Sequence, residues 1–277
     1  MENNTTIGFI GAGNMSYALI SGLINNGYSN KKIKASDANT ELLSQRSSEF
    51  NLEVFTDNSE LAINCDVVVL AVKPQVLSTV CRDIKNFIKH KPLVLSIAAG
   101  VKSIDINRWL GGKASIVRAM PNTPALLGKG VAGIYANAKV SEKQKSIGEE
   151  ILNSVGSCLW VENEVLLDAV TSLSGSGPAY FFLMIESMTK AGAALGLDEK
   201  IAQELSIQTA LGASMMASNS ENVSIRQLRA NVTSPNGTTE AAINSFQDQN
   251  FGLIVSRAMR AAFERARTIG AELGDDD

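Results

Sequence analysis

The sequence predicts an α/β domain over residues 1–164, followed by an all-helical domain over residues 165–277. Short apolar runs alternate with helix-like segments in the first part, and this alternation indicates a parallel sheet with helices on both faces. After about residue 165 the strand signal stops and long apolar helical patterns replace it. A chain of 277 residues is also long enough for about two domains of ordinary size.

The strands of the first domain are predicted from short runs rich in β-branched residues. The clearest is Val67–Val72, whose continuous apolar composition is typical of a strand buried on both faces. A helix beginning after Ser141 carries a capping box with Gln144. The predicted strands cover residues 6–10, 33–36, 54–55, 67–72, 93–97, 116–119, 131–135 and 158–161, and the clearest helices cover 15–26, 40–50 and 75–88.

The second domain is predicted to be helical throughout. Pro178 can occupy a first helical turn, where its missing N–H costs nothing. Gly196 is suited to end that helix, and Asp198 to cap the next one. The predicted helices cover residues 178–195, 198–218, 225–232, 239–247 and 253–273. Small residues are frequent in these helices, which favours close helix–helix contact and, with an apolar face left over, a homo-oligomer.

Composition excludes several classes of function. The net charge of −3 and the aromatic fraction of 5% argue against nucleic acid as a partner. The only histidine, His90, lies in a polar connector, which excludes a multi-histidine metal site, and we predict no bound metal. Three scattered cysteines indicate buried or semi-buried thiols in a reducing compartment. The apolar runs are too short to span a bilayer and the start of the chain resembles no signal peptide, so we expect a cytoplasmic protein without a membrane partner.

A glycine-rich turn follows the first predicted strand. Gly11 suits a tight turn and Gly13 a backbone that must approach a pyrophosphate, while Ser16 occupies the position of the third glycine of a dinucleotide-binding fingerprint. Such a turn often has no ligand, but here a strand precedes it and a helix follows it. The sequence therefore predicts dinucleotide binding at the start of the first domain.

Asp37 closes the second predicted strand, about 20 residues beyond the glycines, where a carboxylate binds the ribose hydroxyls of NAD. It would repel the additional phosphate of NADP. The alternative is that Asp37 only caps the following helix. Two further loops, Ala71–Pro74 and Ser96–Gly100, end buried strands and are placed to contact the nicotinamide half of a cofactor, although both can also be ordinary connectors.

Six segments together resemble the pyrroline-5-carboxylate reductase family, in order and nearly from end to end. The last two of these segments are the most specific. The segments are Gly8–Met15, Ala71–Pro74, Ser96–Gly100, Arg118–Pro124, Leu173–Tyr180 and Val232–Thr239.

The resemblance implies a Rossmann-type NAD(P)-binding domain followed by an all-α dimerisation and substrate-binding domain. It implies NAD(P)H-dependent reduction of 1-pyrroline-5-carboxylate to L-proline, the last step of proline biosynthesis, by hydride transfer to the cyclic imine. The cofactor is NADPH or NADH, and Asp37 favours NADH. The resemblance also implies a homodimer through the helical domain, which can assemble further, for example into a decamer.

The family's site residues carry over by position. Its catalytic hydroxyl falls on Thr239. The implied cofactor contacts are Ile10, Gly11, Ala12, Gly13, Asn14, Met15, Asp37, Asn58, Ala71, Val72, Lys73, Pro74, Ile97, Ala98, Ala99 and Asn231. The implied substrate contacts are Glu164, Ser234, Gly237, Thr238 and Thr239.

The sequence departs from the family pattern at three positions. Ser16 replaces a glycine or alanine, and Asp37 replaces a residue that accepts the NADP phosphate in many members. Asn236 stands where the family usually has glycine, and asparagine tolerates a positive φ better than other non-glycine residues.

Reduction of a cyclic imine that carries a carboxylate needs a hydride donor, a proton for the imine nitrogen and a group that holds the carboxylate. A positioned hydroxyl suffices for the proton, and we assign it to Thr239. The N-terminus of the helix after Ser234 offers free N–H groups for the carboxylate. The alternative from spacing alone is that Thr238 or Thr239 is only an N-cap.

Other residues have structural interpretations. Arg118 is expected to form a structural ion pair, and Leu173–Pro178 to be an interdomain turn. A β-hydroxyacid dehydrogenase is one alternative function, although Lys190 comes late for that family's catalytic lysine. A non-catalytic NAD(H)-binding sensor is another, against which the complete loop Thr233–Thr239 argues.

Overall fold

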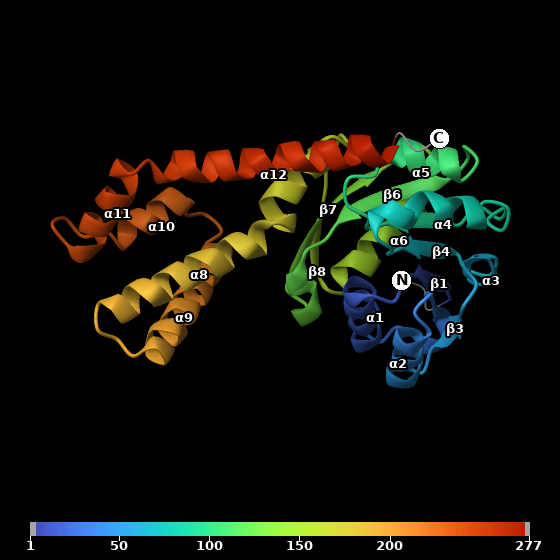
Figure 1. The fold of residues 1–277 in the computed structure, drawn as a ribbon, viewed down its shortest axis with the longest axis horizontal. Coiled ribbons are helices and arrows are strands. Elements are labelled where there is room, and N and C mark those ends of the chain that lie inside the picture. Colours follow the sequence, from blue (N-terminus) through green and yellow to red (C-terminus); the bar gives the residue numbers. More distant parts are fainter. Residues whose placement is uncertain (1–3, 275–277) are drawn as a thin grey trace. The chain divides into compact units, whose positions relative to one another are not determined.

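The structure is a computed structural model that describes residues 4–274. These residues form two compact units (Figure 1). One consists of the chain up to Ser176 and again from Ala262 onward, and the other of Gly177–Ala261. The last helix therefore contributes residues to both units. The predicted domain boundary between residues 164 and 165 stays a prediction.

The first unit is built around one eight-stranded sheet with the order β3-β2-β1-β4-β5-β6-β7-β8. The chain order reverses between β1 and β4, which both lie in the middle of the sheet, and a switch of this kind is where α/β sheets bind ligands. The strands are β1 (Ile7–Ile10), β2 (Ile33–Ser36), β3 (Glu53–Phe55), β4 (Val67–Leu70), β5 (Leu93–Ser96), β6 (Ser115–Met120), β7 (Gly130–Ala136) and β8 (Gly156–Trp160). All eight predicted strands are present, although β4 ends two residues earlier than predicted.

Helices cover both faces of the sheet, as predicted, because strand residues alternate between two hydrophobic cores. One core contains Phe9 and Val69 and packs against α1 and α6; the other contains Val68 and Leu70 and packs against α4 and α5. The helices of this unit are α1 (Asn14–Asn25), α2 (Thr40–Phe50), α3 (Asn58–Ala62), α4 (Leu77–Ile84), α5 (Ser103–Trp109), α6 (Glu142–Asn153) and α7 (Leu166–Val170). Of these, α3, α5 and α7 were not predicted; all three have seven residues or fewer and give little periodic signal.

The prediction of a parallel sheet is wrong for one pair of strands. Strands β6 and β7 run antiparallel, while all other neighbouring pairs are parallel. The connection between Met120 and Gly130 holds only one short 3₁₀ turn, Thr123–Leu127. A parallel crossover needs about a dozen residues or more, so the chain turns back instead.

The segment predicted as an interdomain turn is helical. Residues Thr171–Gly175 form a π-helical turn that continues α7. The hydroxyls of Thr171 and Ser174 donate to carbonyls four residues earlier, at 2.7 and 3.1 Å. Back-bonding of this kind to the carbonyl four residues earlier often bends a helix, and it occurs here at the widened π turn.

The second unit is entirely helical over its residues, as predicted. Pro178 lies in the first turn of its first helix, Gly196 has a φ of +100°, and the Asp198 side chain caps the second helix. The helices are α8 (Gly177–Ala194), α9 (Glu199–Ser218), α10 (Ile225–Asn231) and α11 (Thr238–Asp248), followed by α12 (Phe251–Gly274), which both units share. Over residues 4–274 no helix is long and apolar enough to cross a membrane.

Candidate functional site

The glycine loop after β1 lies beside the loop after β4, at the point where the strand order reverses. Gly11 has a φ of +100°, and a Cβ there would lie 2.5 Å from the Ala71 carbonyl oxygen. A glycine is therefore required on both conformational and steric grounds. The buried Ser16 hydroxyl donates to the Gly11 carbonyl at 2.5 Å, so this departure from the fingerprint stabilises the turn.

Gly13 differs from Gly11, because the protein itself leaves room for a side chain at this position. A Cβ at this position would meet no atom within 4 Å, so it would project into open space. Gly13 is also the N-cap of α1, and no side chain caps that helix. The N–H groups of its first turn are therefore uncapped, and no side chain at Gly13 blocks access to them. This arrangement suits a pyrophosphate. The first residues of α1, Asn14 and Met15, are placed with them.

Asp37 does not cap the following helix, so the alternative interpretation is wrong. The N-cap of α2 is Asn39, whose side chain accepts from the Leu42 N–H. The Asp37 carboxylate instead accepts from the N–H groups of Ala12 and Asn39, at 2.7 and 2.8 Å. These bonds fix both oxygens beside the glycine loop and leave lone pairs for ribose hydroxyls.

The remaining predicted cofactor residues of this unit lie at the carboxyl ends of neighbouring strands. The Asn58 amide oxygen accepts from the Ser36 hydroxyl at 2.7 Å, which brings it to the end of β2. Ala71–Pro74 follow β4, and Ile97–Ala99 follow β5. The fold thus brings together at one edge of the sheet every predicted cofactor contact except Asn231.

Three side chains beside the same loop, Arg46, Tyr17 and Glu49, form a cluster that the sequence analysis did not predict. The Arg46 Nε donates to the Ala12 carbonyl at 3.2 Å, and its guanidinium lies 4.5 Å from the centre of the Tyr17 ring. Glu49 binds both partners, accepting from Arg46 at 3.3 Å and from the Tyr17 hydroxyl at 3.0 Å. This hydrogen bond and the nearby charge of Glu49 raise the pKa of Tyr17. The only sequence signal was the i,i+3 spacing of Arg46 and Glu49.

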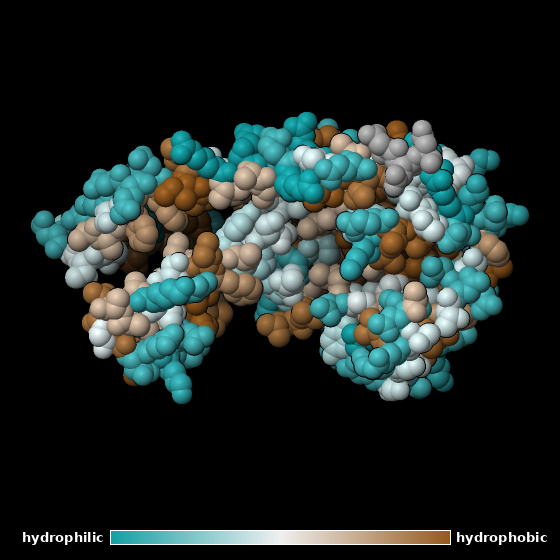
Figure 2. Space-filling view, in the orientation of Figure 1, coloured by the Kyte–Doolittle hydropathy of each residue, from teal (hydrophilic) through white to brown (hydrophobic). Residues whose placement is uncertain are grey.

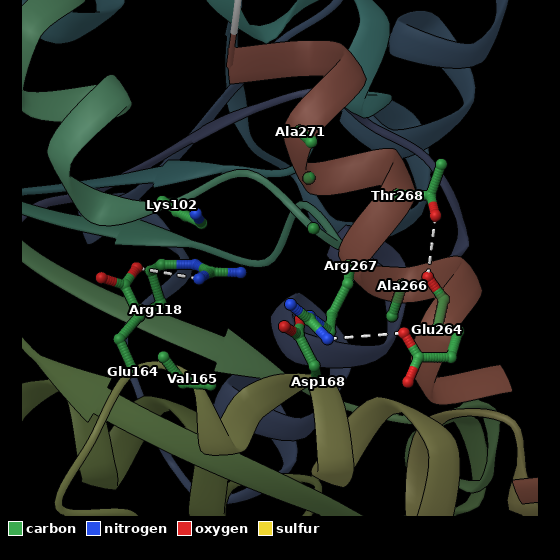
Figure 3. Close-up of a pocket in the computed structure, with 12 residues that line it drawn as sticks. Lys102, Arg118, Glu164, Val165, Asp168, Glu264, Ala266, Arg267, Thr268 and Ala271 are labelled. Carbon is green, nitrogen blue, oxygen red and sulfur yellow. Dashed lines mark hydrogen bonds and ion pairs between the residues drawn. The ribbon is translucent and has the colours of Figure 1, made fainter. Parts of the chain in front are cut away.

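A cavity of about 570 Å³ opens in the same unit (Figure 3). One wall carries Arg118 on β6 together with Glu164, which precedes α7. Their side chains form the expected ion pair at 2.8 Å and are mostly buried. Glu164 also accepts from the Ser103 N–H and hydroxyl, at 2.5 and 2.7 Å. Both oxygens of the predicted substrate contact are therefore occupied by protein donors.

Asp168 is the cavity's other notable carboxylate, and it was not predicted. Figure 3 shows it beside Arg267 of α12, which pairs with Glu264 at 3.4 Å. Burial raises the pKa of the Asp168 carboxyl, while the charges of Arg118, Lys102 and Arg267 oppose the rise. The cavity thus combines cations with a carboxylate that is easier to protonate than usual. The Arg118 Nε is buried there without a hydrogen-bond partner over residues 4–274.

The predicted substrate loop and Asn231 belong to the helical unit. Asn231 is the last residue of α10, and its amide oxygen accepts from Gln227 at 2.8 Å. Asn236 adopts a φ of +58°, as its tolerance for positive φ predicts. Ser234 closes this turn, because its carbonyl accepts from the Gly237 N–H at 3.0 Å.

The threonines after this turn begin α11. Its N-cap is Gly237, and no side chain caps the helix, so the interpretation of Thr238 or Thr239 as only an N-cap is wrong. The Thr239 hydroxyl makes no hydrogen bond within the part of the chain that the structure describes. The N–H groups of the first turn have no side-chain cap, while the Glu240 carboxylate of the same turn accepts from the Asn236 N–H at 2.8 Å.

Comparisons with known proteins show which family the chain belongs to. A family model described as pyrroline-5-carboxylate reductase dimerisation matches residues 164–269, and one described as NADP oxidoreductase, coenzyme F420-dependent, matches residues 6–100. A pyrroline-5-carboxylate reductase of Pseudomonas aeruginosa is 48% identical, with 97% of this chain and 98% of the relative covered.

Two solved structures are similar over almost their whole length. A pyrroline-5-carboxylate reductase from Coxiella burnetii has a TM-score of 0.92 at 41% identity and covers 96% of this chain and 98% of its own. A Plasmodium falciparum pyrroline carboxylate reductase with NADP bound has a TM-score of 0.85 at 32% identity, covering 97% and 99%. On these grounds the chain belongs to the pyrroline-5-carboxylate reductase family.

Proposed function

We propose that this protein reduces 1-pyrroline-5-carboxylate to L-proline with NADH or NADPH. The observation that carries the proposal is that similarity to the family spans both units, including the glycine loop of one and the Ser234–Thr239 loop of the other. The bare backbone at Gly13 and the fixed Asp37 carboxylate fit a dinucleotide. The bound dihydronicotinamide supplies the hydride.

The reaction adds a hydride to the imine carbon and a proton to the imine nitrogen. The Thr239 hydroxyl is our candidate to hydrogen-bond the nitrogen during proton transfer. The uncapped N-terminus of α11, with Gly237 and Thr238, suits the substrate carboxylate because the helix dipole and free N–H groups favour an anion. Ser234 completes the proposed substrate contacts of this loop. Glu164 stays a predicted contact, although Ser103 and Arg118 already donate to its two oxygens.

The cofactor contacts divide along the dinucleotide. Ile10–Met15 would hold the pyrophosphate, and Asp37 and Asn58 the adenosine ribose. The loops Ala71–Pro74 and Ile97–Ala99, with Asn231, would lie near the nicotinamide. Because Asp37 carries a negative charge where NADP carries its extra phosphate, we propose that NADH is used at least as well as NADPH.

We propose a homodimer formed through the helical unit. The exposed apolar side chains on α8 and α9 support it, and an assembly of dimers such as a decamer stays a prediction. As further support for the reductase over a β-hydroxyacid dehydrogenase, the Lys190 side chain is exposed and paired with Glu186.

The activity can be tested with the purified full-length protein, 1-pyrroline-5-carboxylate, and either NADH or NADPH, by following nicotinamide absorbance. We expect oxidation that depends on the imine, with kcat/KM for NADH at least equal to that for NADPH. Oxidation of neither cofactor would contradict the proposal, and cofactor binding without oxidation would favour the non-catalytic sensor.

A further inference from the structure

Two opposite charges flank one residue of the glycine loop. The Ala12 N–H donates to the Asp37 carboxylate at 2.7 Å, while the Ala12 carbonyl accepts from the Arg46 guanidinium at 3.2 Å. Asp37 is the proposed ribose contact. A guanidinium therefore lies in the corner of the site where NADP would place its additional phosphate, the group that an arginine commonly recognises in such folds.

Arg46 is not free to reach that phosphate, because Glu49 and Tyr17 hold it. The guanidinium stacks on the Tyr17 ring and pairs with Glu49, whose second oxygen accepts from the Tyr17 hydroxyl. The ring of Phe50 packs against Tyr17 with centroids 5.3 Å apart. The Arg46 side chain is only 13% exposed, whereas Glu49 is 43% exposed.

The charges of this corner also oppose a phosphate. Asp37 and Glu49 are negative and Arg46 is positive, so the three side chains sum to one negative charge. A phosphate monoester adds about 1.5 to 2 further negative charges near neutral pH. Without the charge of Glu49 the corner would be neutral, and the guanidinium would lose one of its hydrogen-bond acceptors and could turn its planar donors toward a phosphate.

We propose that Glu49 determines cofactor choice by clamping Arg46 against Tyr17 and Ala12, so that the cation is withheld from the 2′-phosphate of NADP. The proposal rests on the proposed function, because it requires the glycine loop to bind a dinucleotide. It assigns cofactor selection to two carboxylates. Asp37 repels the phosphate directly, and Glu49 also holds Arg46, the cation that would otherwise pair with the phosphate.

The proposal can be tested by binding alone, with 5′-AMP and 2′,5′-ADP as probes that differ in one phosphate. Isothermal titration of the full-length wild type should show 5′-AMP binding at least as tightly as 2′,5′-ADP. In Glu49→Gln we expect about 3- to 10-fold tighter binding of 2′,5′-ADP, the range of a partly exposed charge interaction, with 5′-AMP changed less than about twofold. The gain should shrink as salt is raised.

Two further variants separate the clamp from a general change in the helix. Tyr17→Phe removes one hydrogen bond to Glu49 but keeps the ring stacking and the ion pair, so the preference should stay as in wild type. In the double variant Arg46→Gln, Glu49→Gln the gain should disappear, because the cation that receives the phosphate is gone. Thermal unfolding followed by circular dichroism checks that each variant folds, and Glu49→Ala serves in place of any Glu49→Gln protein that does not.

An unchanged preference in Glu49→Gln would overturn the proposal, as would a gain that persists in the double variant. Failure of both nucleotides to bind to the wild type would overturn the cofactor site itself, and the clamp with it. Binding of both nucleotides with an unchanged preference in the variants would leave the proposed function standing and remove only the clamp.

Discussion

The two compact units bury their apolar side chains to very different extents. In the first unit, large side chains such as Phe9, Leu19 and Leu95 are fully inaccessible. In the second unit, Phe182 is 65% exposed, Leu195 88% and Leu205 53%. Figure 2 shows apolar side chains on the outer surface of the helical unit.

This difference shows that the sheet unit carries its own core, whereas the helical unit needs another surface to cover its apolar side chains. Exposed patches of this kind on a folded chain mark an interaction site. Each large apolar side chain that is removed from water contributes about 1.5–3 kcal/mol. A second copy of the same helices, as the matched dimerisation model suggests, would cover the patch on both copies.

The largest expected effect comes from placing a charge on that surface. Leu205→Asp should weaken the dimer by at least about a thousandfold, because a symmetric interface buries the unpaired charge twice. Light scattering and sedimentation measure the change. Gln203→Glu, which adds a charge at a polar exposed position of the same helix, should leave the assembly intact. A Leu205→Asp protein that remains dimeric would contradict the comparison.

A smaller effect separates two glycines of the sheet unit. Gly11→Ala should destabilise the unit by about 1–3 kcal/mol, because its φ is positive and its Cβ would meet the Ala71 carbonyl. Gly13→Ala should leave the melting temperature unchanged, because the added methyl group meets no protein atom within 4 Å. It should weaken cofactor binding, because that methyl group would occupy space proposed for the pyrophosphate. Urea unfolding and titration with NADH measure the two properties. Equal stability losses in both variants would show that Gly13 has a structural role as well.

The smallest expected effect concerns Asp168. Its folded-state pKa is raised above the ordinary value of 3.8, so the protonated form is favoured by folding. Its stabilising contribution is therefore complete below the unfolded-state pKa and is lost as the pH rises through the folded-state pKa. Asp168→Asn should be at least as stable as wild type at neutral pH, and the difference should shrink in acid. Thermal unfolding from pH 4 to pH 7 measures it, and a variant less stable at neutral pH would indicate that the carboxylate is needed in its ionised form.

The sequence predicted the strands and the longer helices of the sheet unit because local signals specify them, whereas α3, α5 and α7 are too short to give such a signal. Runs such as Val67–Leu70 are apolar on both faces, and the capping box of Ser141 and Gln144 is formed as predicted. Strand β7 runs antiparallel because its connection to β6 is short. Predicting each strand from its own residues takes no account of that length. The π turn at Thr171–Gly175 lies in a serine- and glycine-rich stretch whose composition is typical of a turn, so the sequence does not reveal that it is helical.

Site residues that directly follow a predicted strand could be predicted from the sequence. Contacts between segments far apart in the chain could not. Gly11, Gly13 and Asp37 follow strands and could be placed from spacing. The clamp on Arg46 requires α2 to pack beside Tyr17 of α1, and the anchoring of Glu164 requires Ser103, 61 residues away in the chain. No local pattern encodes either contact. The expected ion pair of Arg118 was confirmed, but its partner was not named in advance.

We propose that the sheet unit holds the cofactor while the helical unit supplies the catalytic hydroxyl. Thr239→Ala and Thr239→Ser test it most directly, by steady-state kinetics together with the Kd of NADH. We predict that Thr239→Ala lowers kcat/KM by about 10- to 1000-fold with an unchanged Kd for NADH, and that Thr239→Ser, which keeps the hydroxyl, restores much of the rate. Near-wild-type kinetics in Thr239→Ala would show that the helical unit supplies no catalytic hydroxyl at this position.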